Sequence, residues 1–152
     1  MPAAPISALA KAMAFLAARP LSELELLAKL RKAGYPDNEA DAAIEECRKR
    51  HYLDDEMLTA DCVDALRNRN LGARQIRFKL ARRGLDAEKV SELLEADPDA
   101  EKQAAERAME SKLRLLRNES DPRKKREKLF RFLVGRGFSP DLIFKLLDNA
   151  DY

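Results

Sequence analysis

The chain has 152 residues, of which 45% are hydrophobic, 37% are charged and only five are glycine. This composition suits solvent-exposed helices better than a β-sandwich, and the length allows one ordinary domain or a few small units that share a continuous core. The formal net charge is only +2, so the total charge does not mark a nucleic-acid-binding protein, and the distribution of charge along the chain becomes the informative quantity.

The sequence carries no clear signal for export, membrane insertion or metal binding. Cys47 and Cys62 lack metal-ligand spacing, so we expect two reduced thiols. Residues 1–20 have no basic region ahead of a long apolar core, and we do not interpret them as a signal peptide. No stretch approaches the ~20 apolar residues that would span a bilayer. We therefore expect a cytoplasmic protein that has no cofactor or metal ion and does not bind membranes.

The first expected unit covers residues 1–50. Its helices are predicted over residues 6–19, from 22 to about 33 and from about 37 to 50, with these residues inward: Leu9, Met13, Leu16, Leu26, Leu27, Leu30, Ala40, Ala43, Ile44 and Cys47. Ser22 and Glu25 form a capping-box pattern, in which the serine hydroxyl accepts from the free amides of the first helical turn. Gly34 stands where a left-handed residue often ends a helix.

Two further units of the same kind are expected over residues 51–96 and 97–152. In the second, Asp54 or Asp55 caps a helix to about residue 69, a second helix ends at Gly84, and Asp86 caps a third. The inward residues predicted for the first of these helices are Leu58, Cys62, Ala65 and Leu66. The third unit starts with a proline after the capping Asp97, and its helices run to about residue 117, over 122–135 and over 139–149. We find no strand signal.

Three glycines align the units: Gly34, Gly84 and Gly137. Apolar residues occupy the same positions around each glycine: Leu30, Leu80 and Leu133 four before; Leu26, Ile76 and Leu129 eight before; Tyr35, Leu85 and Phe138 one after; Ala40, Val90 and Ile143 six after; Ile44, Leu94 and Leu147 ten after. A period of about 50 residues with these columns is typical of a helical array. The sequence thus predicts an all-α chain of three tandem three-helix, helix-turn-helix-like repeats, stacked into an elongated, curved molecule.

Residues for catalysis are scarce. His51 is the only histidine, and at a helix end it is best explained as a surface or capping group. The carboxylate pairs Glu45/Glu46 and Asp54/Asp55 fit helix surfaces and caps. There is no glycine-rich phosphate loop, no nucleophile elbow, and no set of residues for a triad or a zinc site. We therefore do not expect an enzyme.

Charge is strongly segregated along the chain. One basic run contains Arg67, Arg69, Arg74, Arg77, Lys79, Arg82 and Arg83 without an acidic residue among them. A second contains Arg123, Lys124, Lys125, Arg126, Lys128, Arg131 and Arg136, opposed only by Glu127. The acids gather on the third helices of the first two units and on the segment that enters the third unit. The second helices of the last two units are thus predicted to be basic ridges that bind an anionic partner.

Phe78 is the unusual member of the first ridge. At 100° per residue, Arg74, Phe78 and Arg82 form a row nearly opposite the inward residues Ile76 and Leu80. An outward phenylalanine between two arginines suits contact with a protein partner or stacking on a nucleic-acid base. In the alternative interpretation, Phe78 packs against a neighbouring unit and the arginines are a solvated face.

The chain resembles the RecX family of bacterial recombinase regulators over nearly its whole length. The resemblance rests on four motifs: Arg19-x-x-Ser22-x-x-Glu25-Leu26, Tyr52-Leu53-Asp54-Asp55, Gly72-x-Arg74-x-Ile76-x-x-x-Leu80-x-x-x-Gly84 and Lys128-Leu129-x-x-x-Leu133-x-x-Arg136-Gly137-Phe138. Each motif alone is weak, but their order and spacing together are fairly specific. His51 stands where the family has a glycine, which puts the link between the first two units in doubt.

The resemblance implies a function that the residue pattern alone does not supply. Proteins of this family bind the RecA nucleoprotein filament along its helical groove, and they restrain strand exchange, ATP hydrolysis and the filament-stimulated cleavage of the SOS repressor. The implied partners are RecA and, in or near the filament, single-stranded DNA, and we expect a monomer because the exposed faces are charged.

Two other interpretations stay open. In the first, the protein binds nucleic acid weakly by itself, although the acidic third helices, with Glu88 and Glu92 among their residues, would face DNA badly. In the second, it is a helical scaffold for another protein.

Overall fold

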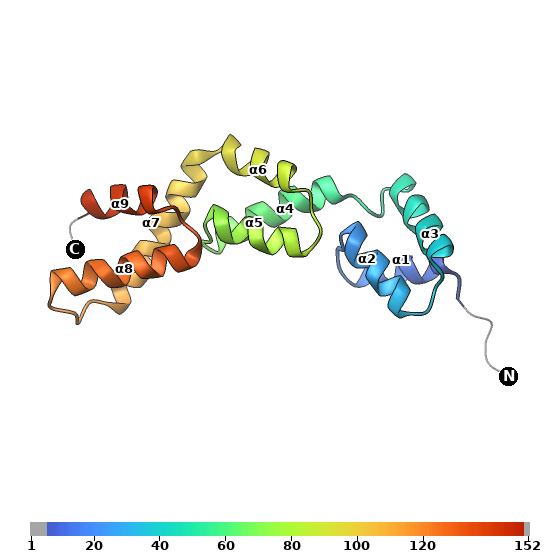
Figure 1. Cartoon of the computed structure of the whole chain (residues 1–152), viewed down its shortest axis with the longest axis horizontal. Coiled ribbons are helices and arrows are strands. Elements are labelled where there is room, and N and C mark those ends of the chain that lie inside the picture. The colour runs from blue at the N-terminus through green and yellow to red at the C-terminus, as the bar shows by residue number, and fades with distance from the viewer. Residues whose placement is uncertain (1–5, 151–152) are drawn as a thin grey trace.

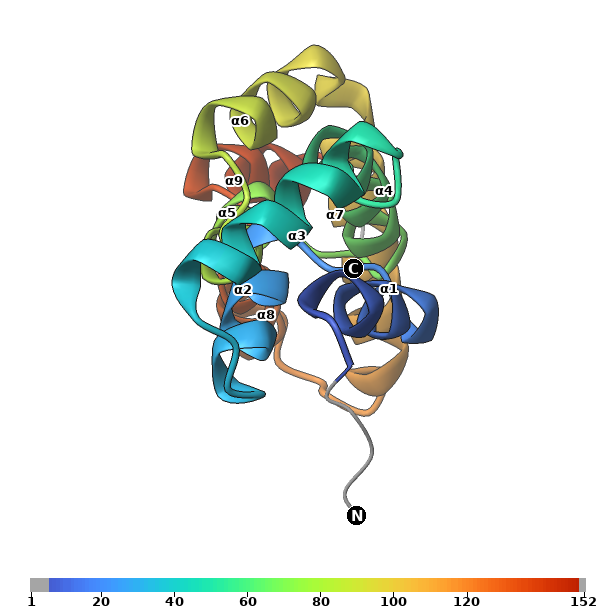
Figure 2. The ribbon, with the colours of Figure 1, turned by 90° about the vertical axis from the view of Figure 1, so that its right-hand side faces the viewer.

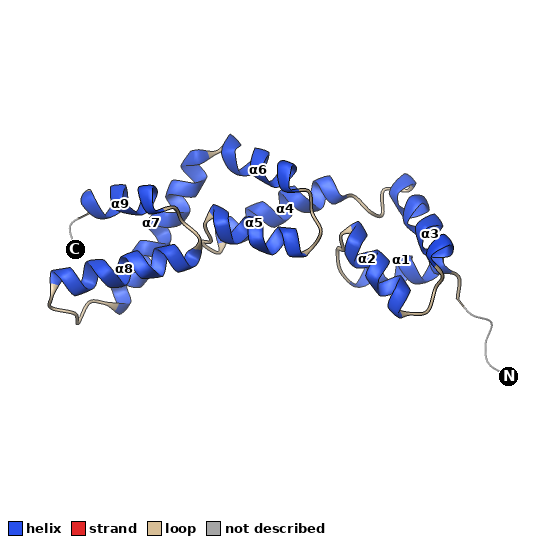
Figure 3. Ribbon diagram, viewed as in Figure 1, coloured by secondary structure: helices blue, strands red, loops and turns tan. Residues whose placement is uncertain are grey.

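The computed structural model describes residues 6–150, and this part of the chain consists of nine helices without strands (Figures 1 and 3). The helices are α1 (Ala8–Ala18), α2 (Glu23–Lys32), α3 (Asp37–Lys49), α4 (Asp55–Asn68), α5 (Ala73–Arg82), α6 (Ala87–Ala96), α7 (Pro98–Leu115), α8 (Pro122–Arg136) and α9 (Pro140–Asp148). We call the successive triplets α1–α3, α4–α6 and α7–α9 units 1, 2 and 3. The predicted all-α repeat array is confirmed, whereas the boundaries after residues 50 and 96 stay a prediction.

The helix ends follow the local signals in the sequence. The Ser22 hydroxyl accepts from the Glu25 amide at 3.1 Å, and the Glu25 carboxylate accepts from the Ser22 amide at 2.9 Å, which completes the predicted capping box. Gly34, Gly84 and Gly137 have φ angles of 97°, 78° and 102°. This left-handed conformation costs a glycine little, and it ends the second helix of each unit in the same way.

His51 has a φ of 59°, so it occupies the same left-handed region just after α3. The glycine expected here from the family pattern would adopt that conformation at lower cost. His51 therefore forms a left-handed turn between units 1 and 2 despite its side chain.

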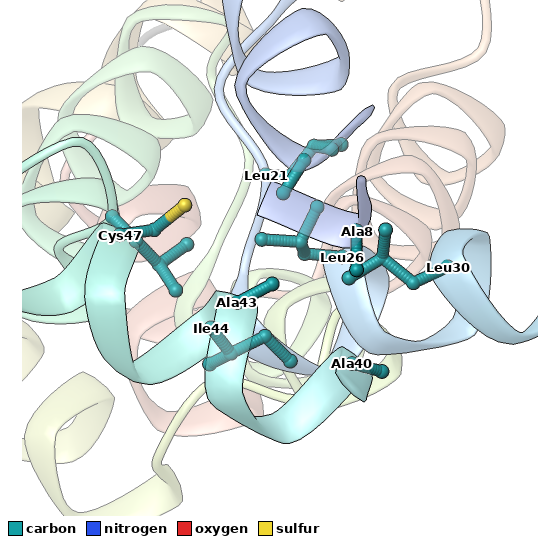
Figure 4. Close-up of a cluster of buried hydrophobic side chains, with 10 residues drawn as sticks. Ala8, Leu21, Leu26, Leu30, Ala40, Ala43, Ile44 and Cys47 are labelled. Atoms are coloured by element: carbon teal, nitrogen blue, oxygen red, sulfur yellow. The ribbon is translucent and has the colours of Figure 1, made fainter. Parts of the chain in front are cut away.

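Each unit has its own cluster of buried apolar side chains, built from the columns that repeat in the sequence. The residues eight positions before the glycines, Leu26, Ile76 and Leu129, each have 0% of their surface exposed. Figure 4 shows the cluster of unit 1, where Leu26 and Leu30 of α2 lie near Ala40 and Ala43 of α3. Because α2, α5 and α8 each bury one face, their remaining faces are available to solvent and to other units.

The buried faces of α1 and α4 differ from the prediction only in part, since Leu9, Leu16, Leu58, Cys62 and Leu66 belong to or pack against the apolar clusters as expected. In α1 the buried residues are Ala8 and Ala12, whereas Met13, which was expected inward, is 37% exposed. The small alanines let α1 pack closely on α3, which also presents alanines. In α4 the expected Ala65 is exposed, and the buried residues are Leu58, Thr59, Val63 and Arg67. Arg67 is buried because α4 packs against α6 and against α7 of unit 3, where Leu94 and Glu101 lie beside its guanidinium.

The three units follow one another along an extended, bent molecule (Figure 1). Viewed along the long axis, α1, α4 and α7 lie on one side and α2, α5 and α8 on the other (Figure 2). The solvent-accessible surface is 10025 Å², compared with about 7,800 Å² for a compact protein of this mass. This excess fits the predicted elongated shape. Within residues 6–150, no helix combines the length and hydrophobicity needed to cross a membrane.

Candidate partner-binding surface

The two basic helices meet end to end. The amide of Gly72 donates to the carbonyl of Arg136 at 2.8 Å, and the amide of Arg74 donates to the carbonyl of Gly137 at 3.1 Å. A Cβ atom on Gly72 would lie only 2.4 Å from the carbonyl carbon of Gly137, so the two backbones touch. The start of α5 is thus seated on the end of α8, and the free amides of one helix satisfy free carbonyls of the other.

Units 1 and 2 are joined in the same way. The Ser22 hydroxyl, at the start of α2, donates to the carbonyl of Arg83, at the end of α5. A Cβ atom on Gly84 would lie 2.4 Å from the Leu24 side chain. The second helices α8, α5 and α2 therefore follow one another in series along one edge of the molecule (Figure 1). As a result, α5 and α8 lie end to end, and we call their exposed basic side chains, Arg77, Lys79, Arg82, Lys124, Lys128 and Arg131, the basic ridge.

The centre of the basic ridge is α5. Phe78 is 59% exposed, and the guanidinium carbon of Arg82 lies 5.7 Å from the centre of its ring, a cation–π contact. Phe78 therefore points outward, as one of the two interpretations predicts, and does not pack into a neighbouring unit. Arg77 and Lys79 are also exposed, although Arg77 lies 3.8 Å from the carboxylate of Glu95. This cluster offers an exposed aromatic ring with a guanidinium group against it.

Helix α8 contributes the other half of the ridge. Lys124 and Arg131 are exposed and Lys125 is half-buried. Lys128 is exposed too, and its ammonium group lies 2.8 Å from the carboxylate of Glu119. The exposed cations therefore continue from α5 of unit 2 onto α8 of unit 3, and Arg69 is exposed just after α4.

Several residues predicted for partner binding instead bond within the chain. Arg67 is only 7% exposed, and its guanidinium donates to the carbonyl of Leu94 at 2.9 Å. Arg136 donates to the carbonyls of Arg69 and Asn70. The structure therefore places Arg67 and Arg136 at the contact between units 2 and 3 and not on an open face. The prediction that Arg67 and Arg136 lie on an exposed binding face is wrong, because a basic run along a helix also includes residues on the buried side of that helix.

Arg74 and Arg83 also have internal partners. Arg74 donates to the carbonyl of Val134 at 2.9 Å although it stays exposed. Arg83 is half-buried, and its guanidinium lies 2.9 Å from the carboxylate of Glu25 in unit 1. Burial alone would raise the pKa of Glu25, but hydrogen bonds from Arg83 and Ser22 hold it below its ordinary value of 4.5. Arg83 thus forms an ion pair that links unit 2 to unit 1.

A carboxylate serves both junctions at the same structural position. The amide of Glu23, the first residue of α2, donates to the carboxylate of Asp55 in unit 2 at 3.0 Å. The amide of Ala73, the first residue of α5, donates to the carboxylate of Glu101 in unit 3 at 2.9 Å. The same Glu101 side chain lies 3.9 Å from Arg67. The first residues of α2 and α5 therefore each donate to an acid of the next unit.

No group of histidine, cysteine, aspartate and glutamate side chains in residues 6–150 is arranged to hold a metal ion. His51 is exposed at the end of α3, where the sequence predicts a surface or capping role. The Arg83 guanidinium lies 3.1 Å from the Cys62 sulfur, and burial raises the pKa of that thiol although the charge of Arg83 opposes the effect.

Two segments of the chain match the models of known three-helix domains. Residues 8–47 match the first three-helix domain of RecX, and residues 99–147 match its third three-helix domain. Regulatory protein RecX of Pseudomonas entomophila is 30% identical over 149 residues, which cover 97% of this chain and 94% of that protein. This chain belongs to the RecX family.

Other relatives of this RecX-family chain carry the same description. Regulatory protein RecX of Legionella pneumophila is 29% identical over 139 residues, 91% of each chain. The protein of that name from Clostridium beijerinckii is 30% identical over 132 residues, and the present chain spans 61% of its length. The crystal structure of RecX from Lactobacillus salivarius superposes with a TM-score of 0.82 at 20% identity, covering 94% of this chain and 96% of that one, which supports the fold.

The sequence contains a signal for the junctions that charge patterning alone misses. In this RecX-family chain, the residues directly before the left-handed glycines Gly34, Gly84 and Gly137 are Ala33, Arg83 and Arg136. The arginines stand at the two positions where another unit docks, and the alanine stands at the open end of the array. This position of the repeat therefore distinguishes the two junction arginines from the exposed residues of the basic ridge. The partner carboxylates Asp55 and Glu101 have no such signal, since they do not occupy equal positions in their helices.

Proposed function

We propose that this RecX-family chain binds the RecA nucleoprotein filament, lies along its helical groove and restrains its recombinase, ATPase and coprotease activities. The proposal places the protein in the regulation of homologous recombination, DNA repair and the SOS response in the cytoplasm. Membership of a family of regulatory proteins supports it. The observation that carries the proposal is the basic ridge, which runs along an elongated molecule and keeps exposed cations on both α5 and α8.

Shape and charge support this function in different ways. An extended array can contact more than one subunit of a filament, which a compact domain of this size cannot do easily. Exposed cations contribute little affinity one at a time, about 0–1 kcal/mol for each pair, but several on one face accelerate association with an acidic surface. Phe78 adds an aromatic group of the kind that often anchors an interface.

The central test reverses charge at Arg77, Lys79 and Arg82 by substituting glutamate. Arg74 is left intact because it bonds to Val134 and its loss would weaken the junction. The expected result is at least a tenfold loss of filament binding and of inhibition of strand exchange at moderate salt. The matched control, Lys49, Lys89 and Lys145 to glutamate, makes the same charge change on the exposed faces of α3, α6 and α9 and should change binding less than threefold. Equal effects of the two triple variants would remove the ridge from the proposal.

A second candidate function is independent binding of single-stranded nucleic acid. Phe78 with Arg82 against its ring is the observation that favours it, since such a pair can stack on an unpaired base. Sequence-specific major-groove reading is disfavoured, because α6 carries Glu88, Glu92 and Glu95. Co-sedimentation with RecA filaments and with bare single-stranded DNA separates the candidates. Binding to DNA without binding to RecA would replace the first proposal by the second, and binding to neither would leave a scaffold role for a different protein.

A further inference from the structure

The two junctions between units each carry a groove, and the two grooves are built from equivalent positions. The first groove, of about 500 Å³, is lined by Glu23, Leu24, Leu27, Asp41, Ile44, Glu45, Arg48, Asp55 and Gly84. The second, of about 520 Å³, is lined by Ala73, Arg74, Arg77, Glu101, Val134, Gly137, Phe138, Ser139 and Pro140. Each groove is lined by three residues of one unit, which stand 11, 10 and 7 positions before its left-handed glycine, and by the left-handed glycine of the next unit. The repeat therefore produces one groove at each junction.

Although their architecture is the same, the grooves have opposite charge. In the first groove, Leu24 and Leu27 occupy the positions that Arg74 and Arg77 occupy in the second. The negative charge of the first groove comes from Asp41 and Glu45 of α3 together with Glu23 and Asp55. We call the first the acidic groove and the second the basic groove.

Charges inside the acidic groove are only partly balanced. Its one cation, Arg48, lies 2.7 Å from the carboxylate of Glu23 and also pairs with Glu45. Burial raises the pKa of Asp55, and the nearby negative charge of Glu23 adds to this effect although the Glu23 amide opposes it. Asp41 also lines the groove and is exposed. The groove therefore has an excess of negative charge that a basic group from outside would relieve.

An apolar wall accompanies this charge. Leu24 is 54% exposed, and Leu27 and Ile44 line the same groove. A lysine or arginine side chain from a partner could lay its aliphatic stem on these leucines and bring its cationic end to Asp41 and Glu45. In the basic groove, Arg74 and Arg77 are exposed and suit a carboxylate in the same way.

From this repeat of architecture with reversed charge, we propose that the two junction grooves dock one protein partner, which presents a basic side chain to the acidic groove and an acidic side chain to the basic groove. A nucleic acid does not fit this pattern, because every phosphate of its backbone is negatively charged and the acidic groove would repel it. Opposite charges in successive grooves also fix the direction in which the array lies on a partner, since reversed binding would bring like charges together.

This inference rests on the proposed function, because it describes how the same molecule would contact a filament of identical protein subunits. It adds that contact extends to unit 1, whose acidic groove lies outside the basic ridge. It also predicts that positive charge added to the acidic groove has opposite effects on binding to the protein filament and on binding to bare DNA. Making the acidic groove basic should weaken binding to the protein filament, whereas it should strengthen any binding to bare DNA.

The test compares D41K/E45K with E88K/E92K in co-sedimentation with RecA filaments assembled on single-stranded DNA. Each variant replaces two exposed carboxylates of a third helix by lysines, so the charge change is the same in both. Only Asp41 and Glu45 line one of the two junction grooves. Circular-dichroism melting first establishes that both variants fold. We expect D41K/E45K to bind the filament at least tenfold more weakly than the wild-type chain, and E88K/E92K to stay within threefold of it.

Equal or tighter filament binding by D41K/E45K would overturn the paired-groove inference while leaving the proposed function in place, provided that the wild-type chain binds. Similar weakening by both variants would overturn it too, because the effect would not belong to the groove. Failure of the wild-type chain to bind the filament would reject the proposed function and this inference with it.

Discussion

At the scale of single residues, three glycines with the same backbone conformation have different surroundings. Gly34 has a φ of 97° and no atom within 4 Å of the place that a Cβ would occupy. Gly137 has a φ of 102°, and a Cβ there would lie 2.6 Å from the amide nitrogen of Gln75. The first glycine is therefore required only by its own backbone, and the second also by the close approach of the next unit.

This difference predicts unequal effects of the same substitution. Gly34→Ala should lower the free energy of unfolding by about 1–2 kcal/mol, the cost of holding a side chain in the left-handed region. Gly137→Ala should cost roughly 2–5 kcal/mol, because a backbone clash is added to that strain. Urea unfolding of both variants measures the two losses. Equal losses would show that the close contact at Gly137 relaxes without cost.

The same scale shows where sequence reasoning succeeds and where it stops. Leu26, Ile76 and Leu129 could be predicted as core residues because burial repeats with the helical period. The role of Arg67 could not be predicted, because it depends on a carbonyl of α6 and a carboxylate of α7 that lie far along the chain. Periodicity reports which face of a helix is apolar, but it does not report what a charged side chain at the edge of that face will meet.

At the scale of elements, the junction between α5 and α2 depends on a partly buried ion pair. Glu25 is bonded to Arg83, lies 3.7 Å from Arg19, and caps its own helix through the Ser22 amide. Its pKa lies below the ordinary 4.5, so the ionised form is stabilised by folding. The stabilisation is complete above about pH 4.5 and is lost as the pH falls through the lower pKa of the folded state.

Glu25→Gln should therefore cost about 1–3 kcal/mol of stability at pH 7, because Arg83 loses its ionic partner in a half-buried setting. Below pH 4 the difference from the wild-type chain should shrink, since the wild-type carboxyl becomes protonated too. Chemical unfolding at a series of pH values measures this difference directly. Glu88→Gln, at an exposed position of α6, is the control and should change stability by less than about 0.5 kcal/mol at every pH. A difference for Glu25→Gln that persists unchanged at pH 3 would argue against the ion pair as its source.

At the scale of the whole molecule, the two junctions differ in strength although they share a design. Helices α4 and α6 both pack against α7, and the nearly buried Arg67 lies within that contact. Within residues 6–150, no helix of unit 1 packs comparably against unit 2, and the contact consists mainly of Arg83, Ser22 and Asp55 with their partners. Units 2 and 3 therefore resemble one body, to which unit 1 is attached through a polar junction.

This asymmetry predicts a sequence of local unfolding. Each unit has its own apolar cluster, so unit 1 can open while the clusters of units 2 and 3 stay intact. Native-state hydrogen exchange should show the slowest amides of α2 and α3 exchanging at a lower opening free energy than those of α5 and α8. Arg83→Ala should lower the opening free energy of unit 1 further, and it should leave the amides of α8 within about 0.5 kcal/mol of the wild-type chain because that helix lies beyond the altered junction. If the slowest amides of all three units exchange at one common free energy, the array unfolds as a single cooperative body, and the polar junction does not set unit 1 apart.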